Sequence, residues 1–359
     1  MTTLGLDTPG DGSAPLPLRG VVVRGRNYSM RLDMRAIVVC CLLALGTVLA
    51  GLVSLSVGSF DLPVSEVFGH LFGNRTEASE FIVGRLRLPR TLIAAGVGFA
   101  FGMSGAIFQA LVRNPLGSPD LIGFNSGAAL GAVIVIFEFE GSRAEISAGA
   151  VAGGLIAALL VYAFAWKRGV QAYRLVLVGI GAKFAVDALV DYELTRADIR
   201  DVREAAVWLT GSLNGRGWDE FRTIVLALIV LAPLAVLMQR RLDRLDLGDD
   251  TAAALGLQVS RVKLALILVG VGLASLGVAA AGPVAFIAFV AGPVARRLVS
   301  SPNACIVPAG FAGAFLMVIA DLAARNLLPT EVPVGIMTAA IGGPYLLWLL
   351  HRQAQTGAL

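Results

Sequence analysis

Charged side chains interrupt one of the apolar stretches of this 359-residue sequence. Lys183, Asp187 and Asp191 lie within residues 174–194, at successive intervals of four. Because residues four apart share one face of an α-helix, Lys183 and Asp187 are placed to form an ion pair. Ionisable groups inside a membrane-spanning helix usually face a cavity or each other. Two interpretations stay open: Lys183 and Asp187 line a path that favours an anionic substrate, or they form a neutral structural pair.

Arginines lie at the ends of two other apolar stretches. Arg87 and Arg90 flank Leu88-Pro89 just before residues 91–112, and Arg325 directly follows residues 307–324. A guanidinium forms paired hydrogen bonds with carboxylates that lysine cannot reproduce. At a lipid headgroup boundary, however, arginines also extend their charged ends toward water while their stems stay in apolar surroundings. The residues alone are compatible with docking of an acidic partner and with simple membrane anchoring.

Residue types that carry most enzyme chemistry are sparse. The two histidines, His70 and His351, are far apart, Cys40 and Cys41 are adjacent in an apolar run, and Cys305 is alone. This spacing matches neither a zinc site nor a disulfide framework. The sequence also lacks the Gly-rich loop with Gly-Lys-Ser/Thr that cradles nucleotide phosphates. We therefore predict no catalytic residue, no metal ligand and no cofactor bound by this chain.

The elements that must position these residues are long apolar segments. Hydrophobic residues make up 57% of the chain and charged residues 15%, whereas about a quarter of a soluble domain is charged. Segments of about 20 apolar residues cross the hydrocarbon core of a bilayer as helices. We predict an all-α polytopic membrane protein with about ten transmembrane helices, at residues 36–57, 91–112, 118–137, 146–166, 174–194, 221–239, 262–281, 284–299, 307–324 and 334–350.

Glycines recur inside these segments. Residues 91–112 contain four and residues 118–137 contain three, the latter at steps of four that place them on one helix face. Small residues allow membrane helices to pack closely. A smooth wall of a wide translocation path is the alternative, for which Gly105 and Gln109 are the candidate lining residues.

Basic residues orient the predicted helices. If the N-terminus is cytoplasmic, 17 of the 29 Lys and Arg residues lie inside and 11 outside, with Lys183 within a span. Cytoplasmic loops of membrane proteins carry an excess of such residues. We expect a mostly disordered cytoplasmic tail at 1–35, a membrane domain at 36–350 and a cytoplasmic C-terminal tail at 351–359. The first apolar run is too long for a cleavable signal core, so we expect it to be retained.

A hydrophilic segment at 239–262 lies on the predicted cytoplasmic side. Asp249 and Asp250 precede an Ala-rich run and favour a helix start, and Gly256 favours its end. A short helix with small side chains could engage a cytosolic partner. An interfacial helix between two spans is the alternative.

Several stretches of the chain resemble the permeases of iron–siderophore, haem and vitamin B12 ABC importers. In order, they are RLRLPRTLIAAGVGFAFGMSGAIFQALVRNPLGSPDLIGFNSGAALG at 85–131, WLTGSL at 208–213, LDLGDDTAAALGL at 245–257, AGPVAFIAFVAGPVARRL at 281–298 and GAFLMVIADLAARNLLPTEVPVGIMTAAIGGPYLLWLL at 313–350. Together they cover most of the chain after the N-terminal tail. The resemblance implies a fold like that of the vitamin B12 importer permease.

The same resemblance assigns roles to both ends of the predicted bundle. It implies that Arg87, Arg90 and Arg325 receive acidic residues from the two lobes of an extracytoplasmic substrate-binding lipoprotein. It also implies that residues 245–258 form a coupling segment that fits a cleft on a cytoplasmic ATPase. The coupling residues are Leu247, Gly248, Asp249, Asp250, Ala253, Leu255 and Gly256.

The resemblance further implies the composition of the complex. Two ATPase subunits would bind ATP and magnesium, since this chain lacks the motif to do so. Many family members have Pro-His where this chain has Gly292-Pro293-Val294, and variants without the histidine resemble the second permease of two-permease systems. We therefore favour a heterodimer with a second permease over a homodimer. We expect no nucleic-acid partner, and lipid contact in a bacterial inner membrane.

The expected cargo is a ferric siderophore, with cobalamin and haem as alternatives. Two other classes of protein remain to be weighed. An ion-coupled secondary transporter would need ion ligands near the midplane, for which Lys183 and Asp187 are the only candidates. A membrane-embedded enzyme would need a convergent set of catalytic groups, which no predicted span carries.

Overall fold

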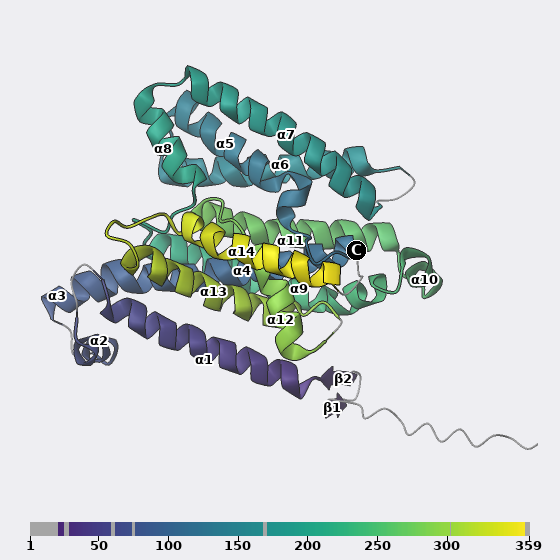
Figure 1. Cartoon of the computed structure of the whole chain (residues 1–359), viewed down its shortest axis with the longest axis horizontal. Helices are drawn as coiled ribbons and strands as arrows, with labels where there is room; N and C mark the ends of the chain where they lie inside the picture. Colours follow the sequence, from purple (N-terminus) through teal and green to yellow (C-terminus); the bar gives the residue numbers. More distant parts are fainter. Residues whose placement is uncertain are drawn as a thin grey trace, which may run out of the picture.

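The computed structural model describes residues 21–24, 29–58, 62–73, 76–167, 171–301 and 303–355. Its described part is a bundle of helices that run roughly along the long axis of the molecule (Figure 1). The long helices are α1 (Met34–Ser56), α4 (Leu88–Val112), α5 (Phe124–Phe139), α6 (Arg143–Ala165), α7 (Ala172–Arg196), α9 (Trp218–Leu245), α11 (Val259–Ala281), α12 (Ile287–Val299), α13 (Ile306–Asn326) and α14 (Val334–Gln355). These helices match the ten predicted spans in order, which confirms the predicted fold class.

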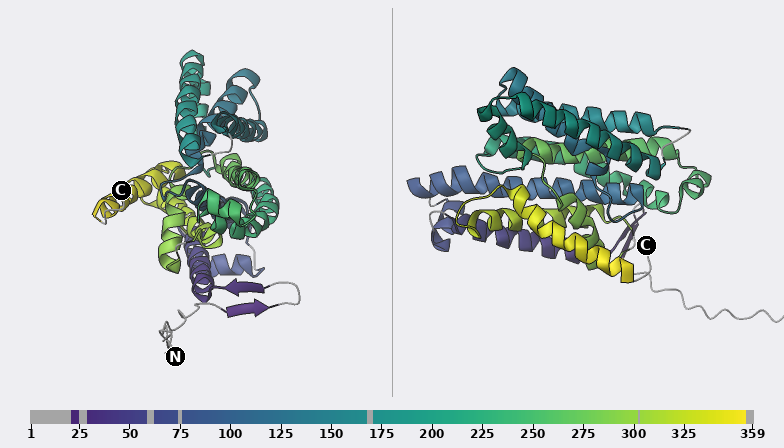
Figure 2. Two further views of the ribbon diagram at one scale, coloured as in Figure 1. Left: turned by 90° about the vertical axis from the view of Figure 1, so that its right-hand side faces the viewer. Right: turned by 45° about the horizontal axis from the view of Figure 1, so that its top comes forward.

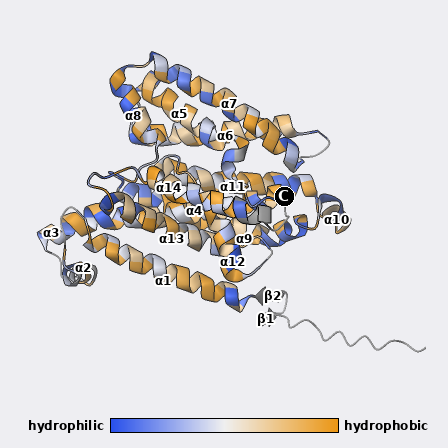
Figure 3. Cartoon of the chain, viewed as in Figure 1, coloured by the Kyte–Doolittle hydropathy of each residue, from blue (hydrophilic) through white to orange (hydrophobic). Residues whose placement is uncertain are grey.

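Several of these helices have the length and composition of membrane spans. Among the described residues they are α1, α6, α9, α11, α13 and the continuous stretch Glu77–Val112 that ends in α4. The helix α7 is long enough but contains Lys183, Asp187 and Asp191, while α5, α12 and the apolar part of α14 are shorter. Figure 3 shows that α1 is apolar along almost its whole length. Its outward residues, such as Leu42 and Val48, are exposed, as expected of a helix that faces lipid.

Short elements lie at the two ends of the bundle. The helices α2 (Val64–Leu71), α3 (Glu77–Ser79) and α8 (Ile199–Leu209) and the π-helix η1 (Glu80–Arg87) lie at one end, which we call the α8 end (Figure 1). The helix α10 (Asp249–Ala254) and the strands β1 (Val21–Arg24) and β2 (Ser29–Leu32) lie at the other, the α10 end. The 3₁₀ helix η2 (Pro119–Ile122) precedes α5.

Some of these short elements were not predicted from the sequence. The helices α2, α3 and α8 lie between the predicted spans, where we expected no helix. The antiparallel hairpin of β1 and β2 falls within the tail that was expected to be mostly disordered, and residues 1–20 and 25–28 of that tail lie outside the described residues. At the C-terminus, α14 continues to Gln355, past the predicted boundary at 350. Residues 356–359 also lie outside the described residues.

The core of the bundle forms around α4, which packs against α9, α11, α12 and α13 (Figure 2). Glycines permit its closest contact. A Cβ atom on Gly102 would lie 2.1 Å from the carbonyl oxygen of Ala309, and one on Gly98 would lie 2.3 Å from that of Gly313. The backbones of α4 and α13 can therefore approach only because these side chains are absent. Large side chains of α4 such as Phe101 and Phe108 fill the space toward α11.

A second glycine contact joins α5 to α6. A Cβ on Gly131 would lie 2.1 Å from the carbonyl oxygen of Gly149, and one on Gly127 would lie 2.6 Å from that of Gly153. The regular spacing of glycines in both predicted spans thus serves helix packing. The helices α5 to α8 form a group on one side of the remaining bundle (Figure 1).

Candidate functional site

The three arginines predicted for docking meet at the α8 end. Arg87 is the last residue of η1, Arg90 lies in the first turn of α4, and Arg325 lies in the last turn of α13. Arg90 donates hydrogen bonds from Nε and Nη2 to Oδ1 of Asp321, at 3.0 and 2.8 Å, and from Nη1 to Oε1 of Glu331, at 2.5 Å. Asp321 is 1% exposed. The close packing of α4 on α13 therefore brings together charges that are 231 residues apart in sequence.

The other two arginines also have partners within the chain. Nε of Arg325 lies 3.3 Å from Oδ2 of Asp321, and its Nη2 contacts the hydroxyl of Ser54 on α1. Nη1 of Arg87 donates to the carbonyl oxygens of Leu55 and Ser56, at 2.8 and 3.2 Å, in the last turn of α1, where carbonyl groups lack partners within the helix. This cluster stabilises the contact between the ends of three helices. A docking role for these arginines stays a prediction.

Asp321 is the member of this cluster that sequence reasoning missed. It lies four residues before Arg325 inside an apolar helix. An acid in that position requires a buried partner, because a lone charge in low dielectric is costly. This signal was present in the sequence, but the partner on α4 was not, since it depends on how two distant helices pack.

The predicted coupling segment forms a knob at the α10 end. Its helix starts at Asp249, as predicted, and ends at Ala254, before Gly256, whose φ of +81° is a backbone conformation that favours glycine. Asp249 accepts hydrogen bonds from Nη2 of Arg113 at 2.8 Å and from Nζ of Lys263 at 2.5 Å. These two bonds fix the knob to the end of α4 and to the start of α11.

The remaining predicted coupling residues are mostly free to contact another molecule. Leu247 is 61% exposed, Leu255 is 58% exposed, and Asp250, Ala253 and Gly256 are also exposed. Gly248 is half-buried, and Ala252 is the fully buried residue of α10. Two large apolar side chains and a small flat surface between them therefore face outward from a knob that is anchored by Asp249. Such a surface is suited to insert into a cleft on another protein.

The charged residues of α7 form the predicted pair. Nζ of Lys183 donates a hydrogen bond to Oδ2 of Asp187, and both side chains remain partly exposed. Lys183 also lies over the ring of Phe184, with Nζ 5.8 Å from its centroid. The pair thus sits on an accessible face of α7, where either of the two interpretations made from sequence is possible.

Gly105 and Gln109, the predicted lining residues of α4, lie at its contact with α12. A Cβ on Gly105 would lie 1.7 Å from the carbonyl oxygen of Ala288, so that glycine is at a helix contact. Gln109 is 2% exposed. Its Nε2 donates to the carbonyl oxygen of Phe289 at 2.9 Å, and its Oε1 accepts from Nη2 of Arg296 at 3.0 Å. Both residues therefore join α4 to α12, and a role in lining a path stays a prediction.

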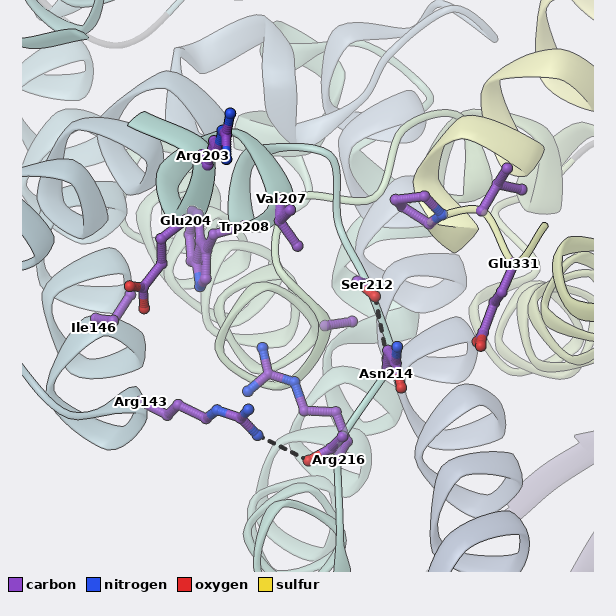
Figure 4. Close-up of a pocket in the computed structure, with 14 residues that line it drawn as sticks. Arg143, Ile146, Arg203, Glu204, Val207, Trp208, Ser212, Asn214, Arg216 and Glu331 are labelled. Carbon is purple, nitrogen blue, oxygen red and sulfur yellow. Dashed lines mark hydrogen bonds between the residues drawn. The ribbon is translucent and has the colours of Figure 1, made fainter. Parts of the chain in front are cut away.

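A cavity of about 700 Å³ opens at the α8 end, lined by residues of α6, α8, the loop before α9 and the segment before α14 (Figure 4). It contains the guanidinium groups of Arg143, Arg203 and Arg216 and the carboxylates of Glu204 and Glu331. Arg143 donates a hydrogen bond from Nη1 to the carbonyl oxygen of Gly215 at 3.0 Å. The sequence signal for this cavity was the large number of arginines in segments predicted to be outside. The cavity itself depends on α8, which was not predicted.

No metal centre is evident in the part of the chain that the structure describes. Within it, no three or more His, Cys, Asp or Glu side chains converge in a way that could hold an ion.

Comparison with known proteins identifies relatives over most of the chain. The model of the FecCD transport family matches residues 46–352. The chain is 39% identical to the ferric enterobactin transport system permease protein FepG of Escherichia coli (strain K12), over 89% of this chain and 98% of that protein. It is 36% identical to the iron(3+)-hydroxamate import system permease protein FhuG of Bacillus subtilis (strain 168), over 84% of this chain and 92% of that one. It is also 37% identical to the hemin transport system permease protein HmuU of Yersinia pestis, over 87% and 96%.

A solved structure supports the same relationship. An ABC transporter assigned to the metal-chelate type, in an inward-facing conformation, superposes with a TM-score of 0.80. It is 26% identical to this chain and covers 88% of this chain and 99% of its own. The family match at residues 46–352 includes the helices that carry the arginine cluster, the knob and α7.

Proposed function

Because this chain belongs to the FecCD transport family, we propose that it is the permease through which an ATP-driven importer carries a ferric siderophore into a bacterial cell. Members of this family are membrane permease subunits of ABC importers, so the chain is a transport subunit and not an enzyme. The similarity to a ferric enterobactin permease over 98% of that protein's length carries the proposal of cargo. Similarity to a hemin permease keeps haem as the second candidate, and cobalamin follows from the resemblance seen in the sequence.

The two ends of the bundle support a division of labour in this proposal. The α8 end, with Arg87, Arg90 and Arg325, would face outward and receive the substrate-binding lipoprotein. The α10 end would face the cytoplasm, with both chain termini, and its knob would enter a cleft on an ATPase. Exposure of Leu247 and Leu255 at the two ends of an anchored helix supports the second role, because apolar side chains at a cytoplasmic surface are stabilised when a partner covers them.

The energy source lies outside this chain. Two ATPase subunits would bind ATP and magnesium and transmit closure through the knob. A second, different permease would complete the translocation path. The absence of the Pro-His pair at Gly292-Pro293 supports a heterodimer, and the exposed charged face of α7 would then border the path between the two permeases.

Uptake measurements in a strain that lacks this gene test the proposal. Iron-55 complexes of a catecholate and of a hydroxamate siderophore, labelled haem and labelled cobalamin are supplied separately. We expect uptake of at least one ferric siderophore to be lost and to return when the gene is restored on a plasmid. Loss of haem or cobalamin uptake, with both ferric siderophores unaffected, would show that the cargo is wrong.

The same strain distinguishes an ATP-driven importer from an ion-coupled transporter. Depleting cellular ATP while an artificial proton gradient is maintained should abolish uptake through the restored permease. Co-purification of a nucleotide-binding subunit with the tagged chain is the second expected result. Uptake that persists on the gradient alone would favour the secondary transporter.

A further inference from the structure

A groove of about 550 Å³ runs along the bundle from the α8 end, between α6 and α9 with the end of α11 as its floor. One face of α6 forms its longest wall, from Arg143 through Ala144, Ala148 and Ala152 to Leu155. The twelve helical steps from Arg143 to Leu155 rise about 18 Å, which gives the length of this wall. All three helices have the length and composition of membrane spans. The groove therefore begins near a headgroup boundary and continues beside apolar residues toward the membrane interior.

Two guanidinium groups lie at the head of this groove. The side chain of Arg216 is 10% exposed, and its Nη1 is 3.9 Å from the nearest acidic partner, Oε1 of Glu220. At that distance Glu220 accepts no hydrogen bond from Arg216, and no other described side chain or carbonyl accepts one from this guanidinium, which has five N–H donors. Arg143 lines the same space, and among the described residues its guanidinium donates one hydrogen bond, from Nη1 to the carbonyl oxygen of Gly215. Figure 4 shows the two guanidinium groups directed toward the same region.

The unmet hydrogen-bond donors of Arg216 favour an anion at this point. Burial lowers the pKa of Arg216, the carboxylate of Glu220 raises it, and the positive charge of Arg143 lowers it by a smaller amount. A buried cation without hydrogen bonds is costly, and an anionic oxygen placed between the two arginines would supply both charge and acceptors. Asp219 and Glu220 also line the groove, but Glu220 is 3.9 Å from Arg216 and Asp219 is almost fully exposed beside Arg222, so neither supplies these contacts.

We propose that this groove is a binding site for one phospholipid, whose phosphate lies between Arg143 and Arg216 and whose acyl chain follows the alanine wall of α6. Small side chains at Ala144, Ala148 and Ala152 leave room for a chain of methylene groups. The bilayer offers an acyl chain equally apolar surroundings, so contact with the alanine wall does not by itself select one lipid. Specificity therefore comes from the phosphate contacts at the head of the groove.

The adjoining cavity at the α8 end shares Arg143 and Arg216 with the groove, and this overlap makes the proposal testable. Arg203 lines only the cavity, and Ala152 lines only the groove. An anionic part of the cargo would reach the arginines through the cavity and would depend on Arg203. A lipid would reach them through the groove and would depend on Ala152.

The test uses the intact importer purified from its own membrane in mild detergent. After extensive washing, retained phospholipid is extracted and quantified by mass spectrometry. Two variants disturb the site: Arg216→Gln removes the charge and Ala152→Phe fills the groove. Their matched controls are Arg203→Gln, which removes a charge from the cavity alone, and Leu160→Phe, which enlarges an exposed residue of α6 that does not line the groove.

We expect the wild-type complex and both controls to retain one phospholipid per permease chain, and both site variants to lose it. Ala152→Phe keeps the test decisive if Arg216→Gln fails to fold, because it alters no charge. Equal retention in all variants, or none in the wild type, would refute the site. Unchanged lipid together with weaker siderophore uptake in Arg203→Gln and Arg216→Gln would assign the arginines to the cargo instead. Lipid retention is measured without cargo, so its outcome does not depend on which substrate is transported.

Discussion

Replacing Asp321 with asparagine should destabilise the protein strongly. Asp321 is 1% exposed and lies between the guanidinium groups of Arg90 and Arg325, whose side chains are 11% and 10% exposed. Asparagine keeps the shape of the side chain but removes its charge, which leaves two buried cations with reduced compensation. Breaking a buried ion pair by removing one partner costs about 3–5 kcal/mol. Glu331 remains to pair with Arg90, so we expect about 3 kcal/mol, at the lower end of that range.

Thermal unfolding of the purified complex in detergent measures this effect. The control is Asp219→Asn, which removes an exposed acid that pairs only with the exposed Arg222, and it should leave the midpoint unchanged. A double variant, Asp321→Asn with Arg325→Met, should recover part of the lost stability, since one of the two unpaired cations is also removed.

The same variants separate the structural role of the cluster from docking. Affinity for the binding protein is measured on Asp321→Asn complexes at a temperature where they remain folded. If the arginines mainly join α1, α4 and α13, stability falls while affinity changes little. An unchanged midpoint combined with altered binding would refute our reasoning and assign the arginines to the partner.

Three further changes test the knob, α7 and the helix contacts. Ala253→Trp should reduce uptake at least tenfold while ATP hydrolysis continues, because a bulky side chain on the exposed knob prevents the knob from entering the cleft on the ATPase. Gly256 is a poorer choice for this test, since its φ of +81° makes any replacement strained. Lys183→Met should lower uptake of an anionic ferric siderophore if Lys183 borders the path, and normal uptake would leave it a structural pair. Gly102→Ala should lower the free energy of unfolding by about 1–3 kcal/mol, measured by thermal unfolding, because the added Cβ would overlap the carbonyl group of Ala309. In the control Gly181→Ala on α7, the added Cβ meets no atom within 4 Å, so the change should be neutral or slightly stabilising.

Local chemistry made much of this protein predictable. Apolar length predicted the ten long helices, because a bilayer requires each span to satisfy its own backbone hydrogen bonds. The start of α10 at Asp249 and the turn at Gly256 followed from the residues that favour helix ends. The Lys183–Asp187 pair followed from a spacing of four. Each of these depends on neighbours within one helical segment.

Contacts between distant segments had to be decided by the tertiary structure. Arg90 could be assigned to a partner from its sequence position, but only the packing of α4 on α13 shows that it is already paired with Asp321. Gln109 could line a path in an isolated helix, whereas α12 covers it in the bundle. The groove and the cavity that share Arg143 and Arg216 likewise arise where α6, α8 and α9 meet. The sequence by itself determined the helices and the knob, because those depend on local composition. The partners of the buried charges depend on which helix faces close, and only the folded bundle decides that.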